Sequence, residues 1–112
     1  MAVSKKSSSK PQIIYPLIFK EEARKDIIEA AQWYAIRLEG LDKRFIQYLE
    51  NVISTIQYNP KTYKKFYKDF RQAALKKFPY VIVYELEKDT IIIYSVFHAK
   101  QHPRKKLNRL KK

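Results

Sequence analysis

The fold is decided by residues 61–104, which read KTYKKFYKDFRQAALKKFPYVIVYELEKDTIIIYSVFHAKQHPR. This stretch begins with interleaved basic and aromatic residues, continues with two apolar segments and ends with the only two histidines of the chain. The first apolar segment alternates with period two, which predicts a β-strand. One face of that strand would carry Phe78, Tyr80, Ile82, Tyr84 and Leu86, and the other Val81, Val83 and Glu85.

Two further strands are expected beside this one. Residues 91–97 follow a turn at residues 87–89 and are almost continuously apolar, which predicts a central strand buried on both faces. Residues 70–75 predict a third antiparallel strand, after the basic and aromatic stretch that opens the segment. The three strands form an antiparallel meander.

Two helices are expected before the meander. Apolar residues recur at three- and four-residue spacing over residues 21–38 and again over residues 41–57. Glu21 and Glu22 suit a helix N-terminus, Gly40 suits a left-handed residue between the helices, and Pro60 stops the second one. The short connection predicts an antiparallel helix hairpin whose apolar stripes need cover. Residues 13–19 are β-prone, but Pro16 restricts them to an edge strand or to a strand that starts after the proline.

Length and composition limit the class of protein. The 112 residues suit one small domain with a single core, which we place at residues 13–104, between a flexible basic arm at 1–12 and a basic tail at 105–112. The chain lacks cysteine, and its two histidines and scattered carboxylates predict no metal site and no cofactor. The apolar runs are too short to span a membrane and no signal-peptide core is present, so we expect a cytoplasmic protein.

The positive charge is distributed unevenly. The formal net charge is +13, and nine of the basic residues lie in the two acid-free ends. Residues 20–59 are nearly neutral, with six basic and seven acidic residues, whereas residues 61–77 hold seven basic residues and only Asp69. This asymmetry predicts an electropositive face for nucleic acid or an acidic protein, the alternative being a solvated surface that only aids solubility. The predicted class is a two-layer α+β fold, with an N-terminal edge strand and a helix hairpin packed on a mainly antiparallel sheet.

The order of these elements resembles the RelE/ParE superfamily of type II toxin–antitoxin toxins, and most closely its plasmid-stabilisation proteins. The segments that carry the resemblance are EEARKDIIEAAQWY, the helix end at Asn59-Pro60, and KKFPYVIVYELEKDTIIIYSVFHAKQHP. The resemblance implies a toxin held inert by a cognate antitoxin. RelE-like members cleave mRNA on the ribosome without a metal, and ParE-like members poison DNA gyrase. Of the two activities, we expect mRNA cleavage, with gyrase inhibition as the alternative.

The resemblance also suggests which residues would act on RNA. Metal-free cleavage needs proton transfer at the ribose 2′-OH and the leaving oxygen, and cations around the phosphate. The candidate catalytic residues are His98, Arg71 and Lys76. The candidate phosphate-binding residues are Lys65, Lys68, Lys77, Lys100 and Arg104.

Each candidate also has a structural interpretation. His98 could be a satisfied residue at the sheet rim, and Arg71 could pair with a carboxylate such as Asp69. Lys76 and Lys77 would point to opposite faces of a strand, so at most one of them can serve a given site.

The chain departs from RelE-like members at Val81, where they usually carry arginine, and its last ten residues lack their tyrosine. A third possibility is a generic nucleic-acid-binding module, which predicts steep salt dependence without growth arrest.

Overall fold

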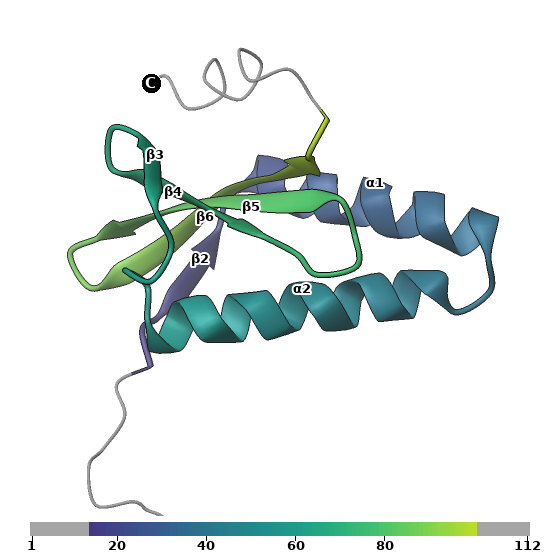
Figure 1. Ribbon diagram of the computed structural model, residues 1–112, viewed down its shortest axis with the longest axis horizontal. Coiled ribbons are helices and arrows are strands. Elements are labelled where there is room, and N and C mark those ends of the chain that lie inside the picture. Colours follow the sequence, from purple (N-terminus) through teal and green to yellow (C-terminus); the bar gives the residue numbers. More distant parts are fainter. Residues whose placement is uncertain (1–13, 101–112) are drawn as a thin grey trace, which may run out of the picture.

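The structure is a computed structural model, and it describes residues 14–100 of the chain (Figure 1). Two helices precede most of a five-stranded sheet, and one short strand precedes the helices. In chain order the elements are β2 (Leu17–Phe19), α1 (Glu21–Arg37), α2 (Leu41–Tyr58), β3 (Lys65–Tyr67), β4 (Phe70–Ala74), β5 (Tyr80–Glu87) and β6 (Thr90–His98). None of the helices in this part of the chain is long and apolar enough to cross a membrane.

The sheet has the strand order β2-β6-β5-β4-β3. From β3 to β6, each strand pairs antiparallel with the next strand along the chain. Strand β2 instead pairs parallel with β6, with Leu17 opposite Ile91. The expected strand at residues 13–19 therefore starts after Pro16 and lies at the sheet edge, as predicted. Strand β6 lies between β2 and β5, and all of its residues from 93 to 97 are buried, which confirms the prediction of a strand covered on both faces.

The meander differs from the prediction in two respects. It contains an extra strand, β3, within the basic and aromatic stretch for which no strand was predicted. Strand β5 begins at Tyr80, so Phe78 lies in the preceding loop, although its side chain is buried in the core. Pro79 explains the late start of β5, because proline has no N–H to donate to a sheet ladder.

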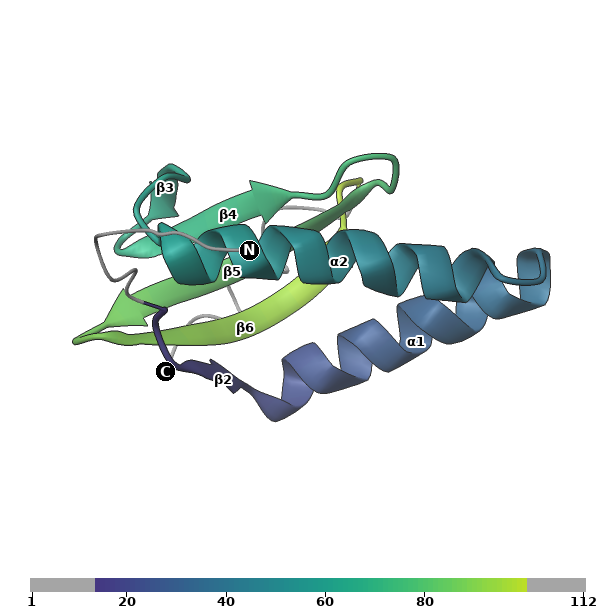
Figure 2. The same ribbon diagram turned by 90° about the horizontal axis from the view of Figure 1, so that it is seen from below.

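The helices form the predicted hairpin against one face of the sheet (Figure 2). Gly40 adopts a left-handed conformation, with φ of 86°, between the two helices, and Glu21 and Glu22 lie in the first turn of α1. Large apolar side chains from both helices and from the sheet form one buried cluster, because each element has an apolar side that water disfavours. Fully covered examples are Phe45, Ile56, Ile82, Ile91 and Ile93.

The other face of the sheet carries a smaller cluster. Its buried members are Phe70, Val83, Tyr94 and Phe97, and its described members all come from strands. The rings of Phe70 and Tyr94 meet edge to face, with centroids 4.9 Å apart. The two faces of the sheet therefore differ in how their apolar side chains are buried. On one face the helices cover them, and on the other they pack against one another.

Candidate functional site

His98 ends β6 and lies opposite Tyr80, the first residue of β5. The two rings meet edge to face, with centroids 5.4 Å apart. The main-chain N–H of Lys100 donates to Nδ1 of His98 over 3.1 Å. Since this bond uses the Nδ1 lone pair, the neutral imidazole carries its proton on Nε2. His98 would have to break the bond to Lys100 or change tautomer before it could accept a proton from a substrate.

Arg71 lies on β4, opposite Tyr84 of β5. Its Nη1 donates to the carbonyl oxygen of Tyr63 over 2.7 Å and to that of Lys61 over 3.4 Å. The buried Tyr84 hydroxyl donates to the carbonyl of Pro60 over 2.6 Å. Together these bonds anchor the loop that follows α2. The alternative that Arg71 pairs with a carboxylate is not observed among residues 14–100, where Asp69 pairs with Lys65 over 3.1 Å.

Burial controls the acidity of the tyrosine beside Arg71. It raises the pKa of Tyr84 to about 12, and this effect outweighs the opposing influence of the Arg71 cation. Tyr84 therefore stays protonated at physiological pH and donates its hydrogen to Pro60. The pair of Tyr84 and Arg71 holds main-chain carbonyls in place.

The predicted lysines lie at three separate places. Lys76 and Lys77 were expected at the far end of a strand, but β4 already ends at Ala74, so both lie exposed in the following loop. Lys76 lines a depression with Tyr48 and Asn51 of α2, on the helical side of the molecule. Lys77 lines another with Arg44 of α2. The loop thus directs both cations toward the helix hairpin.

The remaining cations lie at the two ends of the sheet. Lys65 and Lys68 belong to the β3–β4 hairpin, where the Lys68 ammonium lies 5.4 Å from the centre of the Tyr67 ring. Lys100 is exposed, two residues beyond the end of β6. Arg104 lies outside the described residues.

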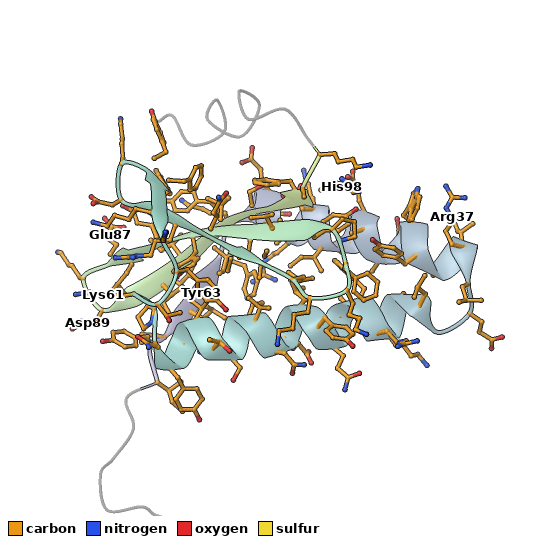
Figure 3. The ribbon with its side chains drawn as sticks, in the orientation of Figure 1. Arg37, Lys61, Tyr63, Glu87, Asp89 and His98 are labelled. Atoms are coloured by element: carbon orange, nitrogen blue, oxygen red, sulfur yellow. The ribbon has the colours of Figure 1, made fainter. Side chains whose placement is uncertain are left out.

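The described candidates therefore do not converge on one point. Arg71 faces Tyr84 and His98 faces Tyr80, so four residues of β5, or about 13 Å of strand, separate their positions. Figure 3 shows His98 well away from Lys61 and Tyr63, whose carbonyls hold Arg71. In the positions that they occupy, the two side chains are directed to different partners, Arg71 to the loop after α2 and His98 to the main chain of Lys100.

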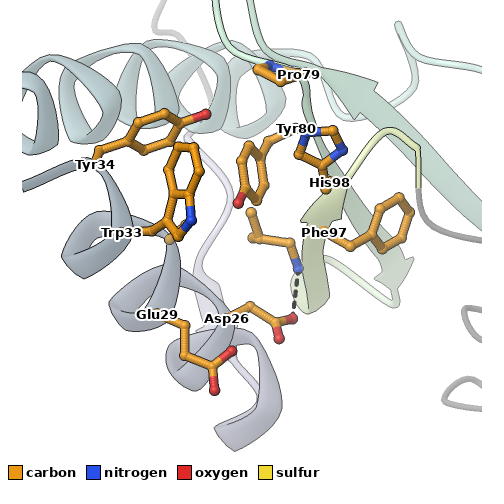
Figure 4. Close-up of a pocket in the computed structure, with 10 residues that line it drawn as sticks. Asp26, Glu29, Trp33, Tyr34, Pro79, Tyr80, Phe97 and His98 are labelled. Carbon is orange, nitrogen blue, oxygen red and sulfur yellow. Dashed lines mark hydrogen bonds between the residues drawn. The ribbon is translucent and has the colours of Figure 1, made fainter. Parts of the chain in front are cut away.

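A cavity that the sequence did not reveal lies between α1 and the adjoining ends of β5 and β6 (Figure 4). Its volume is about 570 Å³, and its walls include Asp26, Glu29 and Trp33 of α1 together with Tyr80 and His98. We call these five residues the α1 groove. Asp26, Glu29 and Trp33 are spaced by three and four residues, which places them on one side of a helix, and this spacing was the available sequence signal.

Asp26 also connects α1 to the sheet. Strand β2 pairs with β6 only as far as Ile93, and no other described strand pairs with the later edge of β6 on that side. One carboxylate oxygen of Asp26, Oδ2, accepts the N–H of Val96 over 3.0 Å and the hydroxyl of Ser95 over 3.1 Å. The carboxylate thus takes the place of a neighbouring strand at this edge, and it fixes one wall of the α1 groove.

Comparisons with known proteins agree with this architecture. The family model for the ParE toxin of the type II toxin–antitoxin system parDE matches residues 17–103. A search of curated proteins finds no match. Among solved structures, the chromosomal ParDE system from P. aeruginosa aligns with a TM-score of 0.65 at 16% identity, covering 76% of this chain and 96% of the other.

Two further solved structures share the fold. A mutant of the E. coli toxin RelE in the free state aligns with a TM-score of 0.57 at 17% identity, over 78% of this chain and 85% of the other. The RelBE2 toxin–antitoxin complex from Mycobacterium tuberculosis aligns with a TM-score of 0.55 at 17% identity, covering 80% of this chain and 97% of the other. The resemblance to the RelE/ParE superfamily is confirmed. The chain belongs to the ParE toxin family and is a toxin of a type II toxin–antitoxin system.

Proposed function

We propose that this toxin arrests growth by binding DNA gyrase without catalysing a reaction, as ParE-like toxins do, and that a cognate antitoxin protein neutralises it. The match to the ParE family model and the similarity to ParDE support this choice. The sequence alone favoured mRNA cleavage on the ribosome. The placement of the candidate residues favours the alternative that the sequence left open.

The observation that carries the proposal is that the two main candidate side chains, Arg71 and His98, are already hydrogen-bonded to main-chain groups. Arg71 is bound to loop carbonyls, and Nδ1 of His98 is bound to the main chain of Lys100. RNA cleavage needs a proton acceptor and cations within about 3 Å of one phosphate group. In this fold the two side chains are bound to different parts of the main chain, and His98 could accept a proton only if its bond from Lys100 breaks. Inhibition by docking requires only a preformed surface.

The test separates the two targets in time. The chain is expressed from an inducible promoter without antitoxin, and incorporation of labelled thymidine and labelled methionine is followed over the first minutes. We expect DNA synthesis to fall first, with full-length messages still present, and gyrase–DNA cleavage complexes to accumulate. Co-expression of the antitoxin encoded beside the toxin gene is the control, and it should restore both signals.

The opposite order would refute the proposal. If methionine incorporation falls first and messages are cut, the toxin belongs with the mRNA-cleaving branch, and His98 and Arg71 must reach one site by rearrangement. Purified gyrase provides a second readout, because a docking inhibitor should change DNA supercoiling in a mixture that contains no ribosome.

A further inference from the structure

The α1 groove differs in charge from the rest of this basic chain. Asp26 and Glu29 supply two carboxylates, and no lysine or arginine is among the described residues that line the cavity. In Figure 4 the hydroxyl of Tyr80 points down toward the two carboxylates, between α1 and β6. A protein with a formal net charge of +13 thus has a locally acidic cavity.

The pKa of Tyr80 is affected by the same two carboxylates. Burial raises the pKa of Tyr80, and the negative charges of Asp26 and Glu29 raise it further. A field that opposes a new negative charge at the Tyr80 hydroxyl favours a positive charge in the same space. The groove is therefore suited to a cation and repels a phosphate.

The aromatic lining is suited to one type of cation. Trp33 is 49% exposed, and the guanidinium carbon of Arg37 lies 4.0 Å from the centre of its ring. The chain itself therefore shows that this indole accepts a guanidinium group. Arginine stacks on aromatic rings and forms paired hydrogen bonds with carboxylates, so a second guanidinium could use both kinds of group in the groove.

We propose that the α1 groove is a protein-docking site that receives an arginine side chain from a partner protein. The guanidinium lies against the rings of Trp33 and Tyr80, it donates hydrogen bonds to the carboxylate of Glu29, and the negative charge of Asp26 attracts it. Tryptophan, tyrosine and arginine are the residues that most often dominate the energetics of protein interfaces. Such a site serves a toxin equally well whether its target is gyrase or the ribosome.

The fluorescence of the chain offers a direct test, because Trp33 is its only tryptophan. The purified full-length protein is titrated with the peptide acetyl-Gly-Arg-Gly-amide while Trp33 emission is recorded. The control peptide carries citrulline, which has nearly the shape of arginine without its charge. We expect a saturable change with the arginine peptide, with a Kd on the order of 1 mM, and no saturable change with citrulline.

A matched pair of variants locates the interaction. Glu29→Gln removes one carboxylate of the groove, and Glu50→Gln makes the same change at an exposed position of α2. We expect Glu29→Gln to weaken binding of the arginine peptide about tenfold, and Glu50→Gln to leave it unchanged. Both variants keep Trp33 as the reporter.

Four results would overturn the proposal. One is an equal response to the citrulline peptide, and another is an equal effect of the two variants. The third is the absence of saturation below about 50 mM of the arginine peptide. An RNA oligonucleotide that alters Trp33 emission when neither peptide does so would also count against it, because it would assign the groove to nucleic acid.

Discussion

The two ends of the sheet differ in charge and in how their polar groups are used. At the β3–β4 end, Arg71 and Tyr84 are directed inward onto the carbonyls of the loop after α2, and the lysines lie outside. At the α1 end, Asp26 holds the edge of β6 while Glu29 and Trp33 remain open to a cavity. Polar groups therefore maintain the fold at both ends, and at the α1 end two carboxylates also line a cavity.

This difference also shows how a charge count can mislead. Residues 20–59 are nearly neutral in sum, so their charge count predicted no charged surface in this part of the chain. Folding sorts these charges, because the carboxylates of Asp26 and Glu29 share one side of α1 and no lysine or arginine is among the described residues that line the cavity. A locally acidic site can thus be formed by a segment with almost no net charge.

The largest effect is expected at the α1 end, for Asp26→Ala. The change leaves the N–H of Val96 and the buried hydroxyl of Ser95 without their shared acceptor. Loss of a charged hydrogen-bond partner for buried groups should lower the free energy of unfolding by about 3 kcal/mol, measured by urea denaturation. The matched change Glu29→Ala, one turn away on an exposed residue, should cost no more than about 0.5 kcal/mol. Equal costs would mean that Asp26 does not hold the sheet edge.

At the other end, Arg71→Ala should be the most destabilising change. It removes the donor that binds the carbonyls of Tyr63 and Lys61, so the loop after α2 loses its anchor. We expect a loss of about 2 kcal/mol in the free energy of unfolding, with growth arrest retained at a temperature where the variant is folded. A stable Arg71→Ala variant that has lost its toxicity would instead assign Arg71 to the target or to chemistry.

The buried Tyr84 predicts a dependence of stability on alkaline pH. Burial raises the pKa of Tyr84 in the folded chain to about 12, above the ordinary tyrosine pKa of 10.0. A raised folded pKa gives stability that is complete below pH 10 and is lost as the pH rises toward 12. The melting temperature should therefore fall over this range, and it should fall less steeply in Tyr84→Phe, which cannot ionise. Parallel curves for the two proteins would show that Tyr84 ionises equally easily when folded and unfolded.

The smallest effect is expected for Lys65→Ala in the β3–β4 hairpin. Its ion pair with Asp69 is exposed, with 51% and 72% of the two side chains accessible. Exposed ion pairs contribute little, because water screens them and ordering both side chains costs entropy. The free energy of unfolding should change by no more than about 0.5 kcal/mol in urea. A cost as large as that of Arg71→Ala would show that the hairpin cations are part of the fold.

The sequence predicted the fold well where apolar spacing is regular. The helices predicted at residues 21–38 and 41–57 are observed at Glu21–Arg37 and Leu41–Tyr58, because long amphipathic segments have one way to bury their apolar sides. Strand β3 was missed as a strand because it has only three residues and an irregular register with β4. A segment that short shows no measurable periodicity.

The site was harder to predict for a physical reason. The sequence placed His98 and Arg71 on strands, as observed. It did not predict their hydrogen-bond partners, because these are main-chain groups, which every residue carries and which no residue type identifies. The α1 groove combines Asp26 with Tyr80 and His98, more than fifty residues away along the chain. Such a combination depends on how α1 packs beside β6, which a one-dimensional pattern does not specify.

The most direct test of the central claim, that this toxin acts by docking and not by cutting RNA, is the toxicity of a double variant. His98→Gln keeps an acceptor for the N–H of Lys100 but cannot transfer a proton, and Lys76→Gln removes an exposed loop cation. Induced without antitoxin, and at equal soluble levels, the double variant should arrest growth as strongly as the unchanged chain. Restored growth in a double variant that keeps its fold and its binding to gyrase would contradict the account, because docking would then be intact and only the chemistry of these side chains would be lost.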